Sequence, residues 1–470
     1  MTPDRIIQLQ VRVWPVALLL ALSLALLSVP LAAGQATAEG SDQSAPERFP
    51  VGAALADYLS WARSHNPRLD VQAARSEVLR ENSRRAGAMP GLKLAWGEMI
   101  VPVETRVGPQ QRVFSVSQSF PWFGTLSAKE SSAASEADAA GETLRGLGWQ
   151  VERDVRTAWY ELGFIQGQIG IVGRNLELAR QTEIHTRAQY ESGEGPYASV
   201  LNAQMDIGRL DARLAGLQDR LTPAAAQLNI AAGLSPDRAA PVLAELPIAL
   251  VRAELPGHEA LSATLQDNNP TLGAWRFQQE SRRHNVAAAD HRSYPDLTLG
   301  VDYIMTGDAI MPGVENSGRD PVIARVAVNI PLWGGQIDAQ QKASAGMLRA
   351  TNAGLTDTRL QLDGQLENAL FAWREAGRNL VLYGETLLPR NEQNLSVVTA
   401  SYESGQASFD DLQAVRQAHL GLELSLLRAG TDRLLALNDL GALLGVSVDD
   451  LARGNLPGPR TESASESEGE

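Results

Sequence analysis

The sequence predicts a mainly helical protein that carries a few amphipathic strands and is built from two internal repeats. The chain is rich in Ala, Leu, Gln, Glu and Arg and has only 5% aromatic residues, a composition that favours long helices. Short motifs recur in the same order in both halves, at offsets of about 203 to 212 residues. One architectural unit used twice indicates a structural duplication, which an enzyme site seldom needs.

Three pairs of motifs define the repeat. Tyr190-Glu191-Ser192-Gly193 returns unchanged at residues 402–405. Asn66-Pro67 reappears as Asn269-Pro270, and Phe120-Pro121-Trp122-Phe123-Gly124 is answered by Ile330-Pro331-Leu332-Trp333-Gly334. We therefore expect a first repeat over residues 51–245 and a second over residues 255–450.

The two ends of the chain have different compositions. Arg5 and Arg12 precede an apolar run from Val13 to Ala33, and Ala36-Thr37-Ala38 offers a cleavage site. This pattern predicts a signal peptide over residues 1–38 and a linker over 39–50, with an uncleaved membrane anchor as the alternative. Residues 455–470 are expected to form a disordered acidic tail, for which cation binding is the alternative.

Charge and residue usage exclude several classes of function. The net charge of −14 makes a nucleic-acid partner unexpected, because little would neutralise phosphates. The absence of cysteine excludes disulfides, thiolate chemistry, cysteine-based metal sites and an N-terminal lipoprotein cysteine. The sequence has no nucleophile elbow, zincin motif or phosphate-binding glycine loop. We therefore expect neither catalysis nor a cofactor.

Four short segments alternate apolar and polar residues. They are expected at about residues 92–101 and 112–120 in the first copy and at about 296–305 and 322–330 in the second. Each is about nine residues long, the length of a tilted strand that crosses a bilayer. A half-buried strand of a soluble sheet has the same alternation and is the alternative.

Long heptad helices follow each pair of strands. Val151, Val155, Ala158 and Leu162 begin a regular 4-3 spacing that continues to Ala179, which predicts a narrow coiled-coil seam. We expect helical hairpins at about 125–233 and 335–445, turning at Gly193 and Gly405. The 67 residues from Ser127 to Gly193 would span roughly 100 Å as one helix, more than a compact domain.

Four strands are too few to close a barrel, and an open sheet edge cannot exist in lipid. If they lie in a membrane, several chains must pool their strands, and three chains would give a trimeric 12-stranded barrel, continued by a long helical coiled-coil barrel. Proline stands at all four changes between helix and strand, namely at Pro90, Pro121, Pro295 and Pro331. Aromatic residues near strand ends fit a membrane girdle, with core packing as the alternative: Trp96, Trp122, Tyr303 and Trp333.

The order of helix, strand pair and long hairpin, present twice, resembles the TolC family of outer-membrane efflux ducts. The resemblance covers about residues 50–450 and is carried by residues 118–124, residues 329–334 and both Tyr-Glu-Ser-Gly turns. It implies a homotrimer in the outer membrane of a Gram-negative bacterium, in contact with lipid, with a long periplasmic tunnel. It also implies a periplasmic adaptor and an energised inner-membrane pump of the RND type. The Phe-Pro-Trp-Phe-Gly form and the loop from Met305 to Pro321 resemble the heavy-metal branch (CusC/CzcC-like).

Several residue types could in principle ligate a metal or form a gate. The six histidines never stand at i, i+4 on one helix face, so each is expected to be a surface histidine. Met99, Met305 and Met311 lie at or near outer strand ends, where lipid or loop packing is favoured over contact with a soft cation. No metal site is expected. Acidic residues near the turns could form a cation-attracting periplasmic gate, with solvated helix ends as the alternative: Glu191, Glu194, Glu403, Asp410 and Asp411.

The sequence thus predicts a passive exit duct of a tripartite efflux pump, with metal cations as the favoured cargo. A multidrug or type I secretion duct of the same fold is the first alternative. A periplasmic coiled-coil scaffold with a small soluble sheet is the second.

Overall fold

The computed structural model describes residue 49 and residues 53–243 and 248–458. The chain divides into two units, Met1–Pro50 and Val51–Glu470, and all of the described helices and strands belong to the second. Both expected repeats lie inside this second unit. The expected signal peptide at 1–38 and the acidic tail after residue 458 lie outside the described residues.

A pair of consecutive helices precedes each pair of strands. The first pair is α2 (Leu55–His65) and α3 (Pro67–Ala86), and the second is α8 (His258–Asn268) and α9 (Pro270–His291). Each Asn-Pro motif starts a new helix. The Asn66 side chain accepts a hydrogen bond from Arg68 N–H at 3.0 Å, and Asn269 accepts from Thr271 N–H at 2.8 Å. The following proline suits the first helical turn because its missing N–H would have no partner there.

Four strands form one antiparallel sheet in the order β1-β2-β3-β4. They are β1 (Lys93–Thr105), β2 (Gly108–Phe120), β3 (Asp296–Thr306) and β4 (Val322–Asn329). The first hairpin is longer than expected, because β1 runs past residue 101 and β2 begins before residue 112. The register shifts between Glu98 and Val103, where Pro102 cannot donate to the ladder.

The first long hairpin consists of α4 (Thr125–Glu191), α5 (Tyr197–Asp219) and α6 (Leu221–Ala232). The whole of α4 is one continuous helix of 67 residues. The expected seam is buried at Val151, Val155, Leu162 and Val172. The returning helix of the expected hairpin is interrupted at Arg220. Pro223 lacks the N–H that would bond back to Asp219.

The second long hairpin consists of α10 (Gly334–Leu380), α11 (Leu388–Glu403) and α12 (Phe409–Leu444). A π-helical segment, η2 (Val381–Leu387), joins α10 to α11. Pro389 stands just after this segment and cannot donate to the carbonyl of Glu385, which loosens the α-helical ladder. Two short helices complete the unit, α7 (Ile248–Val251) and α13 (Val448–Ala452).

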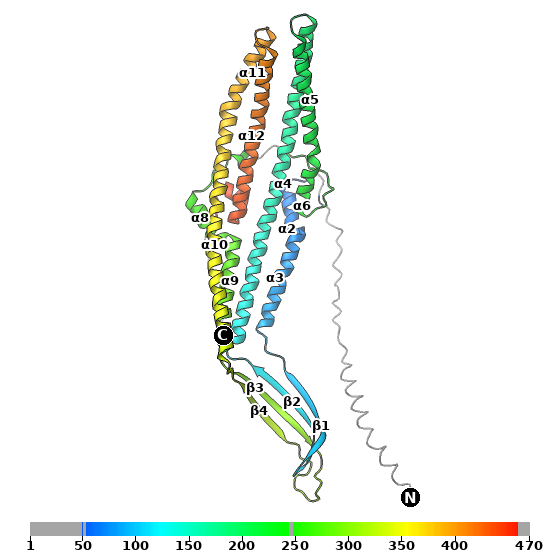
Figure 1. Cartoon of the computed structure of the whole chain (residues 1–470), viewed down its shortest axis with the longest axis vertical. Coiled ribbons are helices and arrows are strands. Elements are labelled where there is room, and N and C mark those ends of the chain that lie inside the picture. Colours follow the sequence, from blue (N-terminus) through cyan, green and yellow to red (C-terminus); the bar gives the residue numbers. More distant parts are fainter. Residues whose placement is uncertain (1–48, 50–52, 244–247, 459–470) are drawn as a thin grey trace, which may run out of the picture. The chain divides into compact units, whose positions relative to one another are not determined.

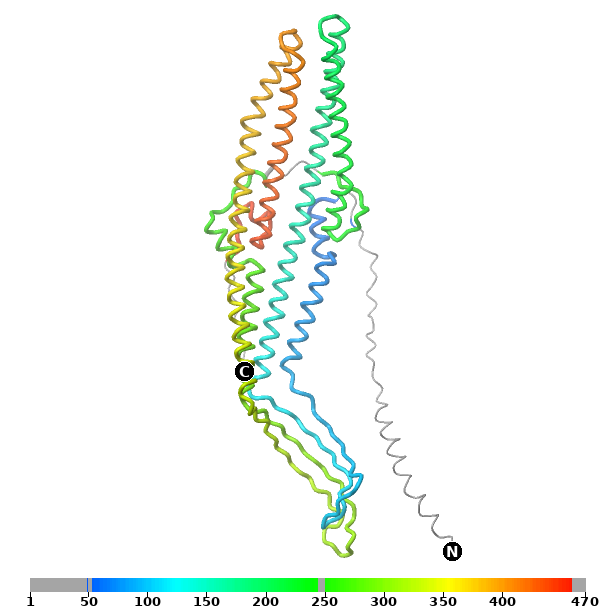
Figure 2. Tube along the Cα trace, viewed as in Figure 1, coloured from blue at the N-terminus to red at the C-terminus, as the bar shows by residue number. Residues whose placement is uncertain are grey.

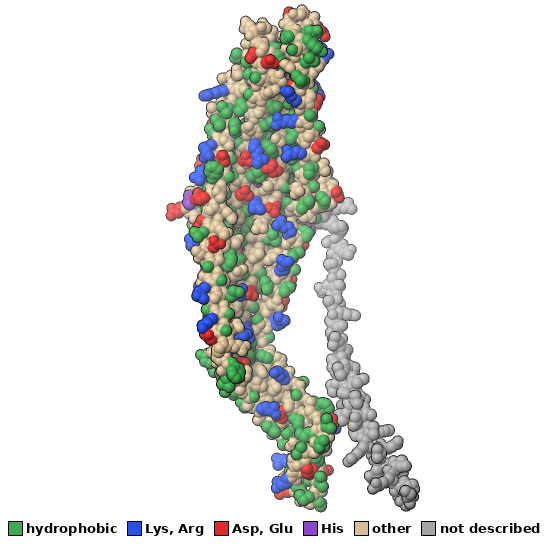
Figure 3. Space-filling model, in the orientation of Figure 1, with side chains coloured by type: hydrophobic (Ala, Val, Ile, Leu, Met, Phe, Trp, Pro, Cys, Tyr) green, Lys and Arg blue, Asp and Glu red, His purple; other side chains and the backbone are tan. Residues whose placement is uncertain are grey.

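The α4 helix lies at the centre of the helical packing. It contacts α3 and α9 along the half nearer the strands, and α5 and α12 along the half nearer the turns, whereas α10 packs on α9 and α12 (Figures 1 and 2). Apolar side chains of α8, α10 and α12 form one core cluster around Leu265, Leu366 and Leu440. Figure 3 shows side chains of both charges scattered over the helices. Among the described residues, none of the helices combines the length and apolarity of a membrane span.

Candidate functional site

The strand register separates the side chains of the sheet into an apolar face and a polar face. Across β1, β2 and β3, one row joins Trp96, Phe114 and Tyr303, and a parallel row joins Leu94, Val116 and Val301. The rows next to these have their side chains on the other face of the sheet. One joins Ala95, Ser115 and Asp302, and the other joins Lys93, Ser117 and Gly300. The apolar face is open to solvent in the single chain, with exposed fractions of 60% at Trp96 and 66% at Val326. A sheet of this kind has to bury its apolar face against something outside the chain.

The two outer strands of the sheet lack a second partner among the described residues. β1 pairs only with β2, and β4 pairs only with β3. All eight residues of β4 are exposed. A long exposed edge with unpaired backbone groups is a template for pairing with another strand.

The junctions between strands and helices are fixed by aromatic stacking and by one carboxylate. The Trp122 ring stacks on Tyr294, with ring centroids 4.8 Å apart and planes 9° apart. The backbone N–H of Trp122 donates to Asp296 Oδ1 at 3.1 Å. Pro121 follows β2 and Pro295 precedes β3, so these two expected junction prolines stand at changes between strand and helix.

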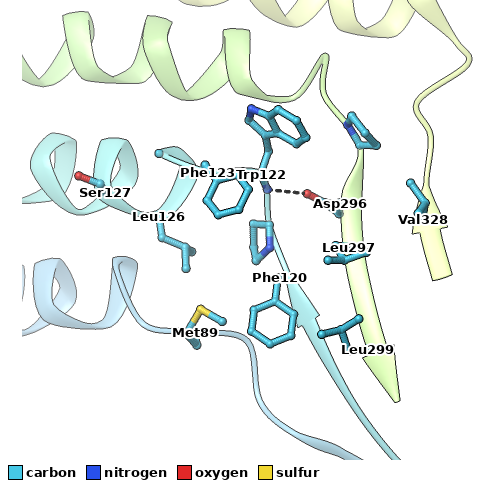
Figure 4. A pocket seen from close by; sticks show the side chains of 13 residues that line it. Met89, Phe120, Trp122, Phe123, Leu126, Ser127, Asp296, Leu297, Leu299 and Val328 are labelled. Atoms are coloured by element: carbon cyan, nitrogen blue, oxygen red, sulfur yellow. Dashed lines mark hydrogen bonds between the residues drawn. The ribbon is translucent and has the colours of Figure 1, made fainter. Parts of the chain in front are cut away.

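An apolar pocket of about 570 Å³ lies at this junction. Met89, Phe120, Phe123 and Leu126 surround it on one side and Leu297 and Leu299 on the other (Figure 4). Apart from Asp296, its sheet residues belong to the apolar face, and Phe123 is 87% exposed. The pocket therefore continues the apolar face up to the first turn of α4.

The four expected girdle residues fall at two levels. Trp96 and Tyr303 share a row across the sheet, in which Phe114 lies between them. Trp122 and Trp333 lie at the starts of α4 and α10. Sequence reasoning missed Phe114 as a member of the first level, although its alternation with Ser115 already placed it on the apolar face.

The turns at the far ends of the two hairpins have the same backbone geometry. Gly193 and Gly405 adopt φ of +81° and +75°. Glu194 N–H donates to the Gln189 carbonyl at 2.8 Å, and Gln406 N–H donates to the Ser401 carbonyl at 2.7 Å. This is the helix-ending bond pattern that needs a left-handed residue, and glycine adopts that conformation without steric cost.

The five candidate gate carboxylates divide between the two turns. Glu191 and Glu194 lie at the end of the first hairpin, and Glu403, Asp410 and Asp411 lie at the end of the second; all five are exposed. Asp411 is engaged in a capping box, because its carboxylate accepts from the Ser408 hydroxyl at 2.6 Å and from Ser408 N–H at 3.1 Å. These bonds lower the pKa of Asp411. The sequence signal for this cap was the serine three residues before the aspartate.

Side chains near the turns tie the two hairpins to each other. The Thr186 hydroxyl on α4 and the Tyr402 hydroxyl on α11 are 2.9 Å apart and buried. Arg416 on α12 donates to the Thr182 hydroxyl of α4, and Asn202 Nδ2 on α5 donates to Asp410 at 3.4 Å. Burial lowers the pKa of Arg416, and Asp206 partly offsets this effect.

An apolar cluster lies beside these polar ties and joins α5 to the second hairpin. It contains Ala203, Tyr402, Phe409 and Leu412. Sequence reasoning missed Thr182, Thr186 and Arg416. The available signal was spacing, since Thr182 and Thr186 continue the 3-4 spacing of the α4 seam after Ala179.

The three methionines and six histidines expected to bind no metal are spread over separate elements. Met99, Met305 and Met311 lie in β1, β3 and the loop after β3. Within the described residues, no group of three or more His, Cys, Asp or Glu side chains is arranged to hold a metal ion. His258 Nε2 lies 2.5 Å from Glu367 Oε1 in an exposed pair.

Comparison with known proteins gives matches in sequence and in fold. Residues 261–446 match the model of the family described as outer membrane efflux protein. The outer membrane protein TolC of Vibrio cholerae is 25% identical over 295 residues, which cover 60% of this chain and 65% of that protein. The chain thus spans just under two thirds of this relative.

Several solved structures share the fold. VceC from Vibrio cholerae has a TM-score of 0.69 at 19% identity, covering 84% of this chain and 96% of that one. CusC, whose structures concern the conformational changes that accompany folding and transmembrane channel formation, has a TM-score of 0.71 at 16% identity. The match covers 84% of this chain and 92% of that one. The open state of the Neisseria gonorrhoeae MtrE outer membrane channel has a TM-score of 0.65 at 17% identity, covering 87% and 91%.

Proposed function

We propose that this chain forms the passive exit duct of a tripartite efflux pump. Its sequence match and its fold support its being a TolC-like outer membrane efflux protein. The protein lies in the outer membrane and has a long periplasmic portion. The observation that carries the proposal is the four-stranded sheet, which has one apolar face, one polar face and two edges that no other described strand pairs with. In lipid such a sheet is stable only if its edges are closed.

Three chains close the barrel in this proposal. β4 of one chain pairs with β1 of the next, and twelve strands form a cylinder with the apolar faces toward lipid and the polar faces toward the lumen. The helices continue this cylinder into the periplasm. The apolar pocket beside Phe123 then lies at the inner boundary of the bilayer, at the aromatic level that contains Trp122.

The proposed partners rest on the resemblance to the TolC family. A duct without an energy source of its own needs an energised pump, here of the inner-membrane RND type, and a periplasmic adaptor that joins the two. The hairpin turns at Gly193 and Gly405 lie at the end of the helices opposite the strands (Figure 1). In our proposal the adaptor meets the duct at these turns.

Metal cations are the cargo that we favour. The support is the Phe120–Gly124 motif and the loop from Met305 to Pro321, which resemble the heavy-metal branch. Drugs, or peptides in type I secretion, are the alternative cargo. A strain that lacks the gene and is complemented with it should regain tolerance to soft metal cations. Restored tolerance to drugs without any change for metals would contradict the metal assignment.

The gate is proposed at the second hairpin, where Asp410 and Asp411 would set six carboxylates around the opening of a trimer, with Glu403 and the first-hairpin Glu191 and Glu194 nearby. The test compares Asp410→Asn and Asp411→Asn in single-channel recordings, with Ser408→Ala as the matched control. Ser408→Ala breaks the same helix cap but leaves the charge in place. Lower cation selectivity in the aspartate variants alone supports a charged gate. Equal effects of Asp411→Asn and Ser408→Ala, with no effect of Asp410→Asn, would assign the role to helix capping instead.

Assembly is tested on outer-membrane fractions of cells that express the full chain. The duct predicts a trimer that migrates as one species in unheated detergent gels and as a monomer after heating. Purified trimer should also form ion-conducting channels in planar bilayers. A soluble monomer in the periplasmic fraction would contradict the duct and favour the coiled-coil scaffold.

A further inference from the structure

The polar face of the sheet contains a buried carboxylate that the proposed duct does not by itself explain. The side chain of Asp302 on β3 is 4% exposed. The Ser115 hydroxyl of β2 donates to Asp302 Oδ1 at 2.6 Å. Arg325 of β4 donates to the other oxygen, Oδ2, and its side chain remains 63% exposed. A buried charge of this kind is stable only when it is paired and hydrogen-bonded.

The geometry of this group crosses three strands. Asp302 is paired in register with Ser115 on one side and Ile323 on the other, whereas Arg325 is paired with Gly300. Arg325 therefore reaches diagonally by two residues to meet Asp302. The side chains of Asp302 and Arg325 both belong to the polar face, so the ion pair lies on the face that would line the lumen.

The ion pair supplies one carboxylate and one cation to the balance of charge on the polar face. Within the paired positions of the strands, the polar face carries two carboxylates, Asp296 and Asp302, and two cations, Lys93 and Arg325. The other residues of this face are mostly small and uncharged, such as Ser115, Ser117 and Gly300. Loss of one carboxylate would leave one unmatched positive charge in each chain.

We infer that Asp302 is a specificity-determining residue of the outer-membrane exit, which it keeps electrically balanced by neutralising Arg325 against the wall. This inference rests on the proposed duct, because it needs the polar face to line a lumen. Without Asp302, three guanidinium groups would project into the narrow cylinder of a trimer. A ring of positive charge attracts anions and repels cations, including the cationic cargo proposed above.

The test measures reversal potentials of purified trimers in planar bilayers under a salt gradient. Asp302→Asn should shift the reversal potential toward anion selectivity. Arg325→Gln should shift it toward cations, because removing the half-exposed guanidinium lets water reach the remaining carboxylate. The double variant D302N/R325Q should return to the wild-type value. These shifts should be large near 0.01 M salt, where charges act over roughly 30 Å, and should fade near 1 M, where they act over roughly 3 Å.

Two matched controls identify the face of the sheet. Lys93→Gln removes a charge from the polar face and should shift selectivity toward cations. Glu98→Gln disturbs an ion pair of the opposite face, in which Glu98 lies 3.6 Å from Arg112, and should leave selectivity unchanged.

The outcomes separate the inference from the duct. The inference is overturned if Lys93→Gln shifts selectivity while the Asp302 and Arg325 variants that assemble behave as wild type. A shift with Glu98→Gln but not with Asp302→Asn would also overturn it, because the apolar face would then line the lumen. Wild-type protein that assembles no conducting trimer would overturn the proposed duct, and this inference with it.

Discussion

Thr182 and Thr186 occupy positions of the α4 seam where the preceding heptads have apolar residues. Both side chains are buried, and their hydroxyls meet Arg416 and Tyr402 of the other hairpin. A buried hydroxyl costs free energy unless it is paired. The two threonines therefore favour one alignment of the hairpins over others in which these hydroxyls would have no partner.

The contact between Thr186 and Tyr402 can be measured with a double-mutant cycle. Thr186→Val and Tyr402→Phe should each lower the free energy of local opening near the turns by about 1 kcal/mol, since each removes one hydrogen bond. The double variant should cost less than the two single costs added together. Hydrogen exchange of the turn peptides provides the measurement. Tyr197→Phe, at an exposed tyrosine, is the control, and an additive cycle would contradict the coupling.

The helix cap at Asp411 should be measurable through the pKa of its carboxyl group. Because Ser408 donates to the carboxylate, the pKa of Asp411 in the folded protein lies below its ordinary value of 3.8. The cap therefore stabilises the hairpin above the unfolded-state pKa and is lost as the pH falls through the lower folded-state value. Carbon NMR of labelled aspartate should give a titration midpoint below 3.8 in wild type. Ser408→Ala should raise that midpoint, and an unchanged midpoint would contradict the cap.

The turns at Gly193 and Gly405 show how a single conformation ends a long helix. A Cβ atom at either glycine would meet nothing within 4 Å, so the cost of a substitution comes from the left-handed backbone alone. Gly193→Ala and Gly405→Ala should each destabilise their turn by about 1 kcal/mol. Gly208→Ala, in the exposed interior of α5, should instead stabilise that helix by about 0.5–1 kcal/mol. Hydrogen exchange of the respective peptides measures both effects, and equal signs would contradict this account.

The spacing of apolar residues was sufficient to predict α4, its seam and the turn at Gly193. The bounds of the first strand pair were less predictable. Alternation fails at Glu98 and Pro102, so the outer part of β1 has no local signal, and only its pairing with β2 extends it to Thr105. The π-helical segment was also invisible, because Tyr383 and Leu387 still follow the heptad. A pattern of apolar residues does not report which backbone hydrogen bonds form.

At the scale of the whole molecule, the two faces of the sheet should tolerate charge differently. Val326→Lys introduces a charge on the apolar face and should cost about 2–4 kcal/mol at the middle of the bilayer. Ala327→Lys introduces the same charge at the next residue, on the polar face, and should be tolerated. The amount of heat-modifiable trimer in outer-membrane fractions gives the comparison. Equal amounts for the two variants would contradict the assignment of the faces.

Contacts between the two hairpins could not have been predicted from local sequence. Thr186 and Tyr402 are 216 residues apart, and no periodicity links them. The same limit applied to the candidate gate. The sequence identified acidic residues beside both turns and a serine three residues before Asp411, and the hydrogen bonds show that Asp411 caps the helix. The Asp302–Arg325 pair was likewise hidden, because strand alternation gives the face of each residue and not its partner.

The π-helical segment has a consequence for the relative lengths of the two long hairpins. The chain from Pro331 to Tyr402 is two residues longer than the matching chain from Pro121 to Tyr190. The shorter chain is continuous α-helix from Thr125 to Glu191, whereas the longer one contains η2. A π turn holds more residues for each turn of helix than an α turn does. The wide turn thus takes up the two additional residues within the length of the helix, so that the second hairpin need not extend beyond the first.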